Sequence, residues 1–246
     1  MSSLTRREMI GGLGALAVQS TVLAQTLSSS PQPGPVILKN FEFSSGSGGM
    51  LAGFCDYNLT TGSLDFIAEV RPLPPGIHTY GANRQAYFLS GNNRPDDLFM
   101  FLKGIVTRAD GIVPGQLYTV SFDIKFASNA NDCPGSGGSP ASVFLKAGGN
   151  TVEPVTELVD DGYVTINIDK GDQSTGGKDM GVIGSIWNGT ECPEEEWILL
   201  RRSYTHPLPI EANPRGELWL AVGTESGYEA TTGVYYYSIK TVLTPV

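Results

Sequence analysis

Apolar and polar residues alternate with a period of two over long parts of this chain, and this alternation constrains the fold more than any other feature. In the run LYTVSFDIKF, residues 117–126, the apolar side chains share one face and the polar ones share the other. The runs YVTINID, residues 163–169, and ELWLAVG, residues 217–223, repeat the pattern. Successive side chains of a strand point to opposite faces, so these runs predict half-buried β-strands.

Other runs are rich in β-branched and aromatic residues and are further strand candidates: VILKNFEF near residue 36, LDFIAEV, QAYFL, ASVFLKA, WILLRRSY and GVYYYSIKTVL. The run DLFMFLKGIV is apolar on both faces, which predicts a central strand covered on both sides or one that bends between sheets. Clusters of glycine and proline separate the runs, and helix signals are scarce. The sequence therefore predicts an all-β fold, an antiparallel two-sheet β-sandwich, and the jelly roll best suits roughly ten strands.

The first 24 residues are typical of an export signal peptide. Arg6 and Arg7 precede an uncharged apolar run from Ile10 to Leu23, which is too short to span a bilayer, and cleavage is expected after Ala24. The arrangement resembles a twin-arginine signal, which implies export of a folded protein across a bacterial inner membrane. An ordinary secretory signal with a chance arginine pair is the alternative. Either one predicts a periplasmic or secreted protein.

Beyond the signal, residues 25–35 are predicted to form a flexible lead and residues 36–246 a single β-sandwich domain. Hydrophobic residues make up 40% of the chain and charged residues 17%, so a sizeable core is available. The formal net charge of −9 argues against a nucleic-acid partner, because phosphate binding needs concentrated positive charge. No second apolar run has the length of a membrane span, so none is expected in the mature protein. The oligomeric state stays open.

Three cysteines in an oxidising compartment leave one without a partner. Cys133 and Cys192 lie in turn-rich segments that continue with proline, whereas Cys55 follows Phe54 in a more apolar setting. We expect a disulfide between Cys133 and Cys192, with Cys55 free and buried. Spacing does not fix connectivity, so a chain without any disulfide is the alternative.

Motifs for catalysis are missing from the sequence, and we assign no catalytic residue. No serine stands in a Gly-x-Ser-x-Gly elbow, and no glycine-rich phosphate loop follows a strand. The two histidines, His78 and His206, are far apart and belong to no metal-binding motif. Among the carboxylates, Asp123 and Glu217 have no second acid at two-residue spacing, although an enzyme could assemble acids from separate strands. The sequence therefore favours a protein without enzymatic activity over an enzyme.

Two loops bring hard oxygen ligands together on glycine-rich backbone, which is what calcium requires. Asp96 and Asp97 lie in GNNRPDD, and Asp169 and Asp172 lie in DKGDQSTGGKD. Neither loop has EF-hand spacing. The alternative is that Asn, Asp and Gly only form turns there. A structural calcium ion is the one cofactor we expect.

Aromatic residues beside glycines in loops are candidate ligand-binding residues, because exposed rings can stack on sugar faces. They are Tyr80, Trp187 and Tyr228. Trp219 and Tyr236 also point away from the apolar faces of their strands, and for these two we favour core packing against a second layer.

The two ends of the array resemble a known family. The opening ILKNFEFSSG, the following Phe54, Asp56 and Tyr57, and the closing GVYYYSIKTVL are similar to the first and last strands of jelly-roll carbohydrate-binding modules. In that family an acidic residue of the first strand and an aspartate of the last often share a structural calcium. Glu42 matches the first position, but Ser238 occupies the second. The middle of the chain resembles secreted bacterial proteins to which no activity can be attached.

These observations favour a non-catalytic binding module of the bacterial envelope or exterior, with a polysaccharide or glycoconjugate as ligand. One alternative is a glycoside hydrolase or another polysaccharide-active enzyme with carboxylates from separate strands. Another is a structural or adhesive domain that binds protein. A concave surface lined by aromatic residues would support sugar binding. A pair of carboxyl groups in a cleft would support glycoside hydrolysis. An exposed apolar patch would support protein binding.

Overall fold

The computed structural model describes residues 34–77, 84–94 and 97–246, and residues 33–246 form one compact unit. The predicted signal peptide with Arg6 and Arg7, most of the predicted lead, and the candidates Tyr80 and Asp96 lie outside the described residues. The strands are β1 (Ile37–Glu42), β2 (Leu51–Cys55), β3 (Tyr57–Asn58), β4 (Ile67–Pro72), β5 (Gln85–Asn92), β6 (Phe99–Thr107), β7 (Leu117–Ser128), β8 (Val143–Asn150), β9 (Thr156–Leu158), β10 (Tyr163–Ile166), β11 (Met180–Ser185), β12 (Ile198–Thr205), β13 (Ile210–Glu211), β14 (Glu217–Ser226) and β15 (Thr231–Pro245). The short 3-10 helices are η1 (Arg108–Asp110), η2 (Pro140–Ser142) and η3 (Asp160–Gly162).

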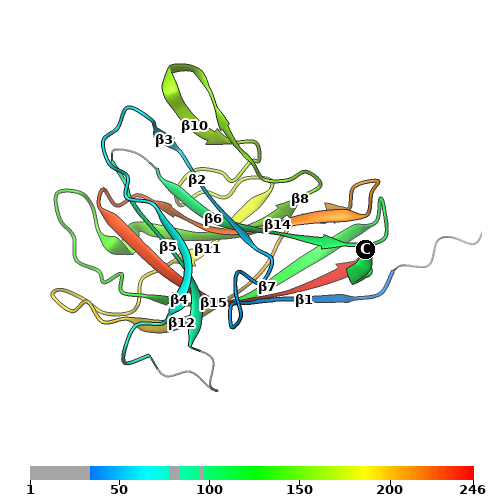
Figure 1. Ribbon diagram of the computed structural model, residues 1–246, viewed down its shortest axis with the longest axis horizontal. Coiled ribbons are helices and arrows are strands. Elements are labelled where there is room, and N and C mark those ends of the chain that lie inside the picture. The colour runs from blue at the N-terminus through cyan, green and yellow to red at the C-terminus, as the bar shows by residue number, and fades with distance from the viewer. Residues whose placement is uncertain (1–33, 78–83, 95–96) are drawn as a thin grey trace, which may run out of the picture. The chain divides into compact units, whose positions relative to one another are not determined.

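The strands form two main antiparallel sheets (Figure 1). Sheet A has the order β12-β7-β15-β5-β4, with β1 beside β15 and β13 beside β7, and sheet B has the order β11-β8-β14-β6-β2. The consecutive pairs β5/β6, β7/β8, β11/β12 and β14/β15 each have one strand in sheet A and the other in sheet B. The order β5-β15-β7-β12 against β6-β14-β8-β11 is that of a jelly roll, so the predicted fold is confirmed.

The main core lies between sheets A and B and is built by the predicted alternation. All five apolar side chains of β7 that share the inner face are at most 2% exposed: Tyr118, Val120, Phe122, Ile124 and Phe126. From sheet B, Leu218, Leu220 and Val222 of β14 enter the same core. Burying each such side chain contributes about 1.5–3 kcal/mol, so this layer is the main source of stability.

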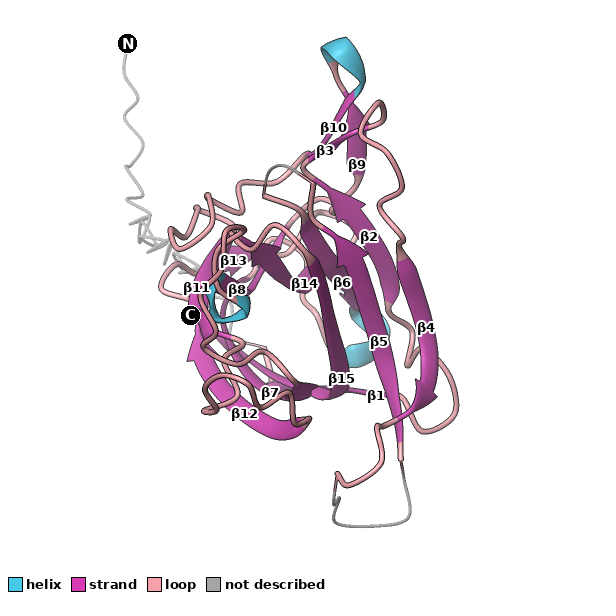
Figure 2. Ribbon diagram, turned by 90° about the vertical axis from the view of Figure 1, so that its left-hand side faces the viewer, coloured by secondary structure: helices cyan, strands magenta, loops and turns pink. Residues whose placement is uncertain are grey.

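The outer face of sheet B is also covered, as the two-sided apolar run at β6 predicts. β6 pairs with β14 on one side and with β2 on the other, which makes it a central strand. Met100 and Leu102 enter the main core, whereas Phe99 and Phe101 join a second apolar cluster. That cluster includes Val164, Ile166, Ile168 and Met180, which belong to β10, the segment after it and the start of β11. β10 also forms a small sheet with β3 and β9, which lies beyond β2 in Figure 2.

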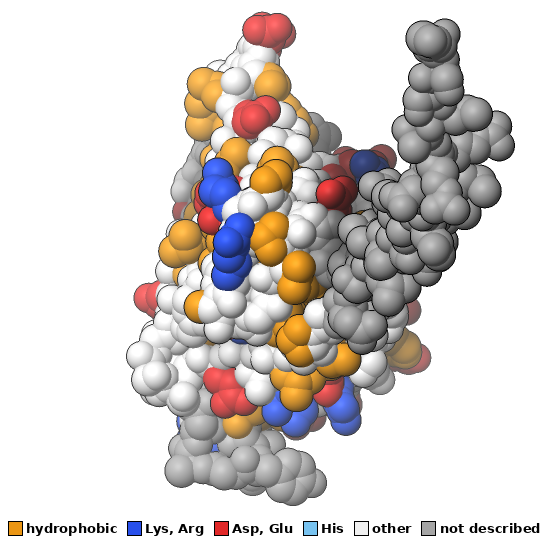
Figure 3. Space-filling model, turned by 90° about the vertical axis from the view of Figure 1, so that its right-hand side faces the viewer, with side chains coloured by type: hydrophobic (Ala, Val, Ile, Leu, Met, Phe, Trp, Pro, Cys, Tyr) orange, Lys and Arg blue, Asp and Glu red, His pale blue; other side chains and the backbone are white. Residues whose placement is uncertain are grey.

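The two ends of the sandwich differ in their surfaces. The end that carries the C-terminus exposes apolar side chains, among them Val113, Leu117 and Val246, and the Val246 N–H donates to the Leu117 carbonyl at 3.0 Å. Figure 3 shows this side of the molecule, where hydrophobic side chains form a stripe that basic side chains interrupt. The connections within the four strand pairs lie at the other end.

Candidate functional site

Four connections meet at one end of the sandwich, which we call the loop end. They join β5 to β6 (residues 93–98), β7 to β8 (129–142), β11 to β12 (186–197) and β14 to β15 (227–230). In an antiparallel jelly roll the first strand of each pair runs toward the same end, so chain segments far apart in sequence converge there (Figure 2). Loops held on a rigid sandwich are where binding residues are most often found.

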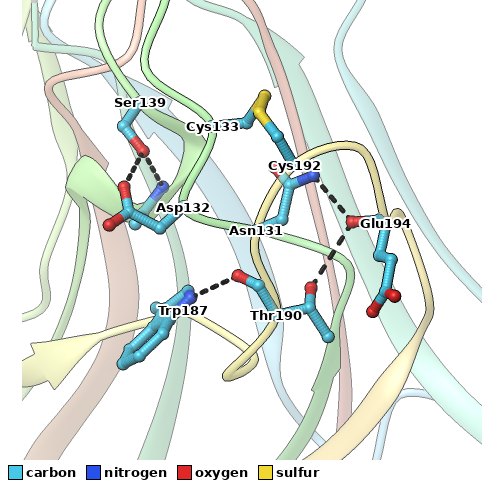
Figure 4. Close-up of a disulfide and its surroundings, with 9 residues drawn as sticks. Asn131, Asp132, Cys133, Ser139, Trp187, Thr190, Cys192 and Glu194 are labelled. Carbon is cyan, nitrogen blue, oxygen red and sulfur yellow. Dashed lines mark hydrogen bonds between the residues drawn. A yellow bond between two sulfur atoms is a disulfide. The ribbon is translucent and has the colours of Figure 1, made fainter.

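A disulfide joins two of these loops. Cys133 of the β7–β8 loop is bonded to Cys192 of the β11–β12 loop, with 4.9 Å between their Cα atoms, and Cys55 is free and buried. Hydrogen bonds flank the disulfide (Figure 4): the Asn131 amide donates to the Glu194 carbonyl at 2.6 Å, and the Asp132 N–H donates to the Thr190 carbonyl at 2.9 Å. The two loops are thus held together by covalent and polar contacts.

Buried asparagine side chains connect the remaining loops. The Asn93 amide donates to the carbonyls of Ser226 and Tyr228 at 3.0 and 3.2 Å, which ties the β5–β6 loop to the β14–β15 loop. Within the β11–β12 loop, the Asn188 amide donates to the Glu196 carbonyl at 2.8 Å. A loop set that is already ordered loses less entropy when it binds a ligand. The loop end is therefore preorganised.

An open cavity of about 180 Å³ lies at the loop end. Its lining is mostly amide, hydroxyl and small apolar groups: Asn129, Ala130, Asn131, Pro140, Ile186, Glu195, Tyr228, Thr231, Thr232 and Gly233. Thr232 is 6% exposed, and its buried hydroxyl has no hydrogen-bond partner among the described residues. The Thr232 oxygen is itself covered, whereas the neighbouring lining residue Thr231 is exposed, so Thr231 is the hydroxyl that a ligand in the cavity can reach.

The structure places two of the predicted ligand-binding rings at this end. Tyr228 is in the wall of the cavity. Trp187 follows the cavity residue Ile186, is 42% exposed, and its indole N–H donates to the Thr190 carbonyl at 2.8 Å (Figure 4). That hydrogen bond fixes the orientation of an exposed ring, which suits a flat ligand surface.

Glu42, the candidate from the resemblance, lies at the end of β1 directly opposite Ser238 of β15. Serine therefore occupies the neighbouring position at which the family has its aspartate. The Glu42 carboxylate is 3.9 Å from the Lys240 ammonium, and its side chain is 52% exposed. Glu42 is not brought together with the other predicted cation ligands among the described residues.

Asp97, Asp169 and Asp172, which come from the two predicted cation loops, line one cleft of about 330 Å³. The Asp169 carboxylate accepts the N–H groups of Gly171 at 3.1 Å and Lys178 at 2.9 Å, and these contacts lower its pKa. Asp97 accepts a hydrogen bond from the Gln173 amide. No three His, Cys, Asp or Glu side chains in residues 34–77, 84–94 and 97–246 are grouped closely enough to hold a metal ion. Calcium binding stays a prediction.

The same cleft contains a buried charged cluster that the sequence did not reveal. Lys170 lies between Asp56 and Glu225, and Glu225 also contacts Lys146. Burial raises the pKa of Asp56, although the positive charge of Lys170 acts in the opposite direction. Spacing gives no sign of this cluster, because its members come from four separate segments of the chain.

No protein-family model matches the sequence, and no curated protein matches it. Among solved structures, the chain is similar to the K3 cleaved adhesin domain of Lys-gingipain from Porphyromonas gingivalis, with 11% identity, a TM-score of 0.35, and 83% of this chain and 97% of that one covered. It is also similar to a carbohydrate-binding module of the β-sandwich superfamily, with 12% identity and a TM-score of 0.37; the match covers 80% of this chain and 58% of that one. A third similar structure is a carbohydrate-binding module in complex with β-1,4-galactotriose, with 12% identity and a TM-score of 0.35; the match covers 81% of this chain and 90% of that one.

The part of the chain that the structure describes contains no helix long and apolar enough to cross a membrane.

Proposed function

We propose that this protein is a carbohydrate-binding module that holds its ligand in the cavity at the loop end. The observation that carries the proposal is the cavity wall itself, which combines the exposed Thr231, the half-buried Asn129 and the aromatic residue Tyr228. Sugars present hydroxyl groups, which both donate and accept hydrogen bonds, around an apolar ring face. A wall that combines hydroxyls, amides and an aromatic ring complements both features.

Size and charge narrow the class of ligand. A cavity of about 180 Å³ is smaller than the roughly 300–1,000 Å³ typical of drug-sized ligands, so it fits one sugar unit of a longer glycan. Glu195 lines the cavity, and the whole chain has a formal charge of −9. Like charges repel, so a neutral glycan is favoured over a sulfated or uronic one.

Export to an oxidising compartment is part of the proposal. The N-terminal segment carries the sequence signals for export, and the Cys133–Cys192 disulfide supports the same location because cytosolic thiols are kept reduced. The module would thus meet glycans in the periplasm or outside the cell.

The test is a glycan-array screen of the mature protein, followed by calorimetric titration of the best neutral glycan with three variants. Thr231→Val removes an exposed hydroxyl of the cavity lining while keeping the side-chain shape, and we expect about a fivefold weaker affinity, since a hydrogen bond contributes about 1 kcal/mol. Tyr228→Ala should weaken binding by about tenfold, because an aromatic contact is worth roughly 0.5–1.5 kcal/mol beyond the area it buries.

The matched control is Thr244→Val, which removes an exposed hydroxyl of the same strand, β15, outside the cavity lining. It should bind like wild type. Equal affinity of all four proteins, or no neutral glycan bound at any concentration tested, would remove the loop end as a glycan site.

The alternative of glycoside hydrolysis requires carboxyl groups that are free to exchange protons with a substrate or its water. Asp56 and Glu225 come from separate segments and share a cleft, but their side chains are only 9% and 0% exposed, so a polysaccharide and its water cannot reach the pair. Asp123 accepts two hydrogen bonds from Arg201 at 2.7 and 2.6 Å, and Glu217 accepts one from Arg215 at 2.8 Å. These contacts favour ion pairing, so binding without catalysis remains our proposal.

A further inference from the structure

Four ionisable side chains from separate segments meet under the outer cover of sheet B. Asp56 lies between β2 and β3, Lys146 is in β8, Glu225 is in β14, and Lys170 follows β10. The Lys170 ammonium is 2.7 Å from the Asp56 carboxylate and also contacts one oxygen of Glu225, whose other oxygen contacts the Lys146 ammonium. The side chains of Lys146 and Glu225 are 0% exposed, and those of Asp56 and Lys170 are 9% and 10% exposed.

The surroundings of the cluster are apolar. Cys55, which precedes Asp56, belongs to the same buried cluster as Phe99, Phe101 and Val164. The Phe99 ring centroid is 5.5 Å from the Lys170 ammonium. Burial in such surroundings disfavours charged groups, and it raises the pKa of Asp56. At Lys170 the charges of Asp56 and Glu225 outweigh the effect of burial and raise the pKa of the ammonium, so a reaction of its nitrogen requires a neighbouring group that accepts a proton.

The backbone holds Asp56 in an unusual conformation. Its φ angle is 61°, in the left-handed region that residues other than glycine rarely adopt. The Asp56 N–H donates to the Val164 carbonyl at 2.7 Å, which fixes this residue to β10. Strained backbone that the surrounding structure maintains is found most often at functional sites. The constraint keeps the Asp56 carboxyl carbon beside the Lys170 nitrogen.

We propose that Lys170 and Asp56 become joined by an intramolecular amide bond in the folded protein, with Glu225 as the residue that carries protons between them. Both reacting groups and the proton carrier are already in contact, so the reaction is unimolecular and gains from proximity.

The chemistry balances without any external reagent. Glu225 takes a proton from the Lys170 ammonium, and the resulting amine nitrogen attacks the carboxyl carbon of Asp56. A nitrogen–carbon bond forms, and one carbon–oxygen bond of the carboxyl group breaks. The released oxygen takes the two protons that Lys170 loses, one of them through Glu225, and leaves as water. No oxidant or reductant is needed.

Lys146 has a different role in the cluster. Its ammonium donates to the carbonyls of Lys170 at 2.9 Å and Thr175 at 3.0 Å and to Glu225, so all three of its N–H groups are engaged. Lys146 positions Glu225, and it balances the charge of that carboxylate once Lys170 and Asp56 have become neutral. The cleft of this cluster shares no lining residue with the loop-end cavity, so the cross-link does not depend on the proposed function.

The test is mass spectrometry of the full purified protein after reduction of its disulfide. The wild-type chain should be lighter than its sequence mass by one water molecule. A protease digest should yield one branched peptide that joins the segment around Asp56 to the segment around Lys170. This peptide identifies the bond without any variant, so it does not depend on how well variants fold.

Two variants complete the test. Glu225→Gln keeps the size of the side chain but removes the proton carrier, and it should have the full sequence mass. The control is Lys103→Gln, which removes the ion pair between Lys103 and Glu153 at 2.7 Å on the same sheet and should keep the missing water. A wild-type chain of full mass would mean that the cluster is an ion-pair network only. A water deficit that persists in Glu225→Gln, or a branch between other residues, would also overturn the assignment.

Discussion

The disulfide between the β7–β8 and β11–β12 loops should make a large and measurable contribution to stability. Cys133 and Cys192 are 59 residues apart in the sequence, and the chain-entropy relation gives about 4 kcal/mol for a closed loop of that length. For a domain of this size, each 1 kcal/mol moves the melting temperature by roughly 2–4 °C. The double variant Cys133→Ser, Cys192→Ser should therefore melt roughly 8–16 °C below wild type.

The assay is thermal unfolding followed by circular dichroism, with and without a reducing agent. Reduced wild-type protein should melt with the double variant, and the reducing agent should leave the double variant unchanged, since Cys55 has no partner to lose. Glycan affinity should also fall, because Asn131 of the cavity wall is two residues from Cys133. A double variant that melts within about 2 °C of wild type would refute the loop-closure reasoning.

Further predictions concern export, calcium and acid. Replacing Arg6 and Arg7 by lysine should leave precursor in the cytoplasm if the twin-arginine route is used, and undiminished export would favour the general route. If calcium at 100 times its dissociation constant binds only the folded state, the domain should gain about 2.7 kcal/mol, and superimposable melting curves in calcium and in chelator would exclude such a site. The hydrogen bond from Lys178 lowers the pKa of Asp169 in the folded chain, so its stabilising effect is complete above about pH 4 and is lost as the pH falls through the folded-state value. Asp169→Asn should therefore reduce the acid sensitivity of the melting temperature below about pH 4, and an unchanged pH profile would contradict this.

The sequence predicts the strands whose two faces differ. β7 and β14 alternate because one face of each packs against the opposite sheet, and β6 lacks alternation because both of its faces are buried. The period-two pattern of apolar residues reflects which side chains are buried. It therefore identifies a strand wherever buried and exposed side chains alternate along that strand.

Two of the strands that escaped prediction, β2 and β11, contain glycine at close contacts. In β2, a Cβ atom on Gly53 would lie 2.3 Å from the Phe101 ring, and in β11 a Cβ atom on Gly181 would lie 1.8 Å from the Tyr204 hydroxyl oxygen. Glycine weakens the strand signal at the very positions where an aromatic side chain of a neighbouring strand needs the space. Such contacts are between distant parts of the sequence, so local patterns do not contain them.

The charged cluster escaped prediction for a related reason. Alternation assigns Lys146 and Glu225 to the outward face of sheet B, where a strand usually meets solvent. The chain between β9 and β11 covers that face, and no spacing in β8 or β14 indicates the cover. Loop positions were predicted better: Trp187 and Tyr228 reach the same end because the jelly-roll order brings their loops together.

The position of β14 and β15 in the two sheets has a consequence for synthesis. β15 is the last strand of the chain, yet it lies between β5 and β7 in sheet A, and β14, the strand before it, lies between β6 and β8 in sheet B. A nascent chain that still lacks residues 217–246 has no central strand in either sheet and cannot close its core. Folding of this domain must therefore await the synthesis of residues 217–246, and a stop codon before β14 removes a central strand from each sheet.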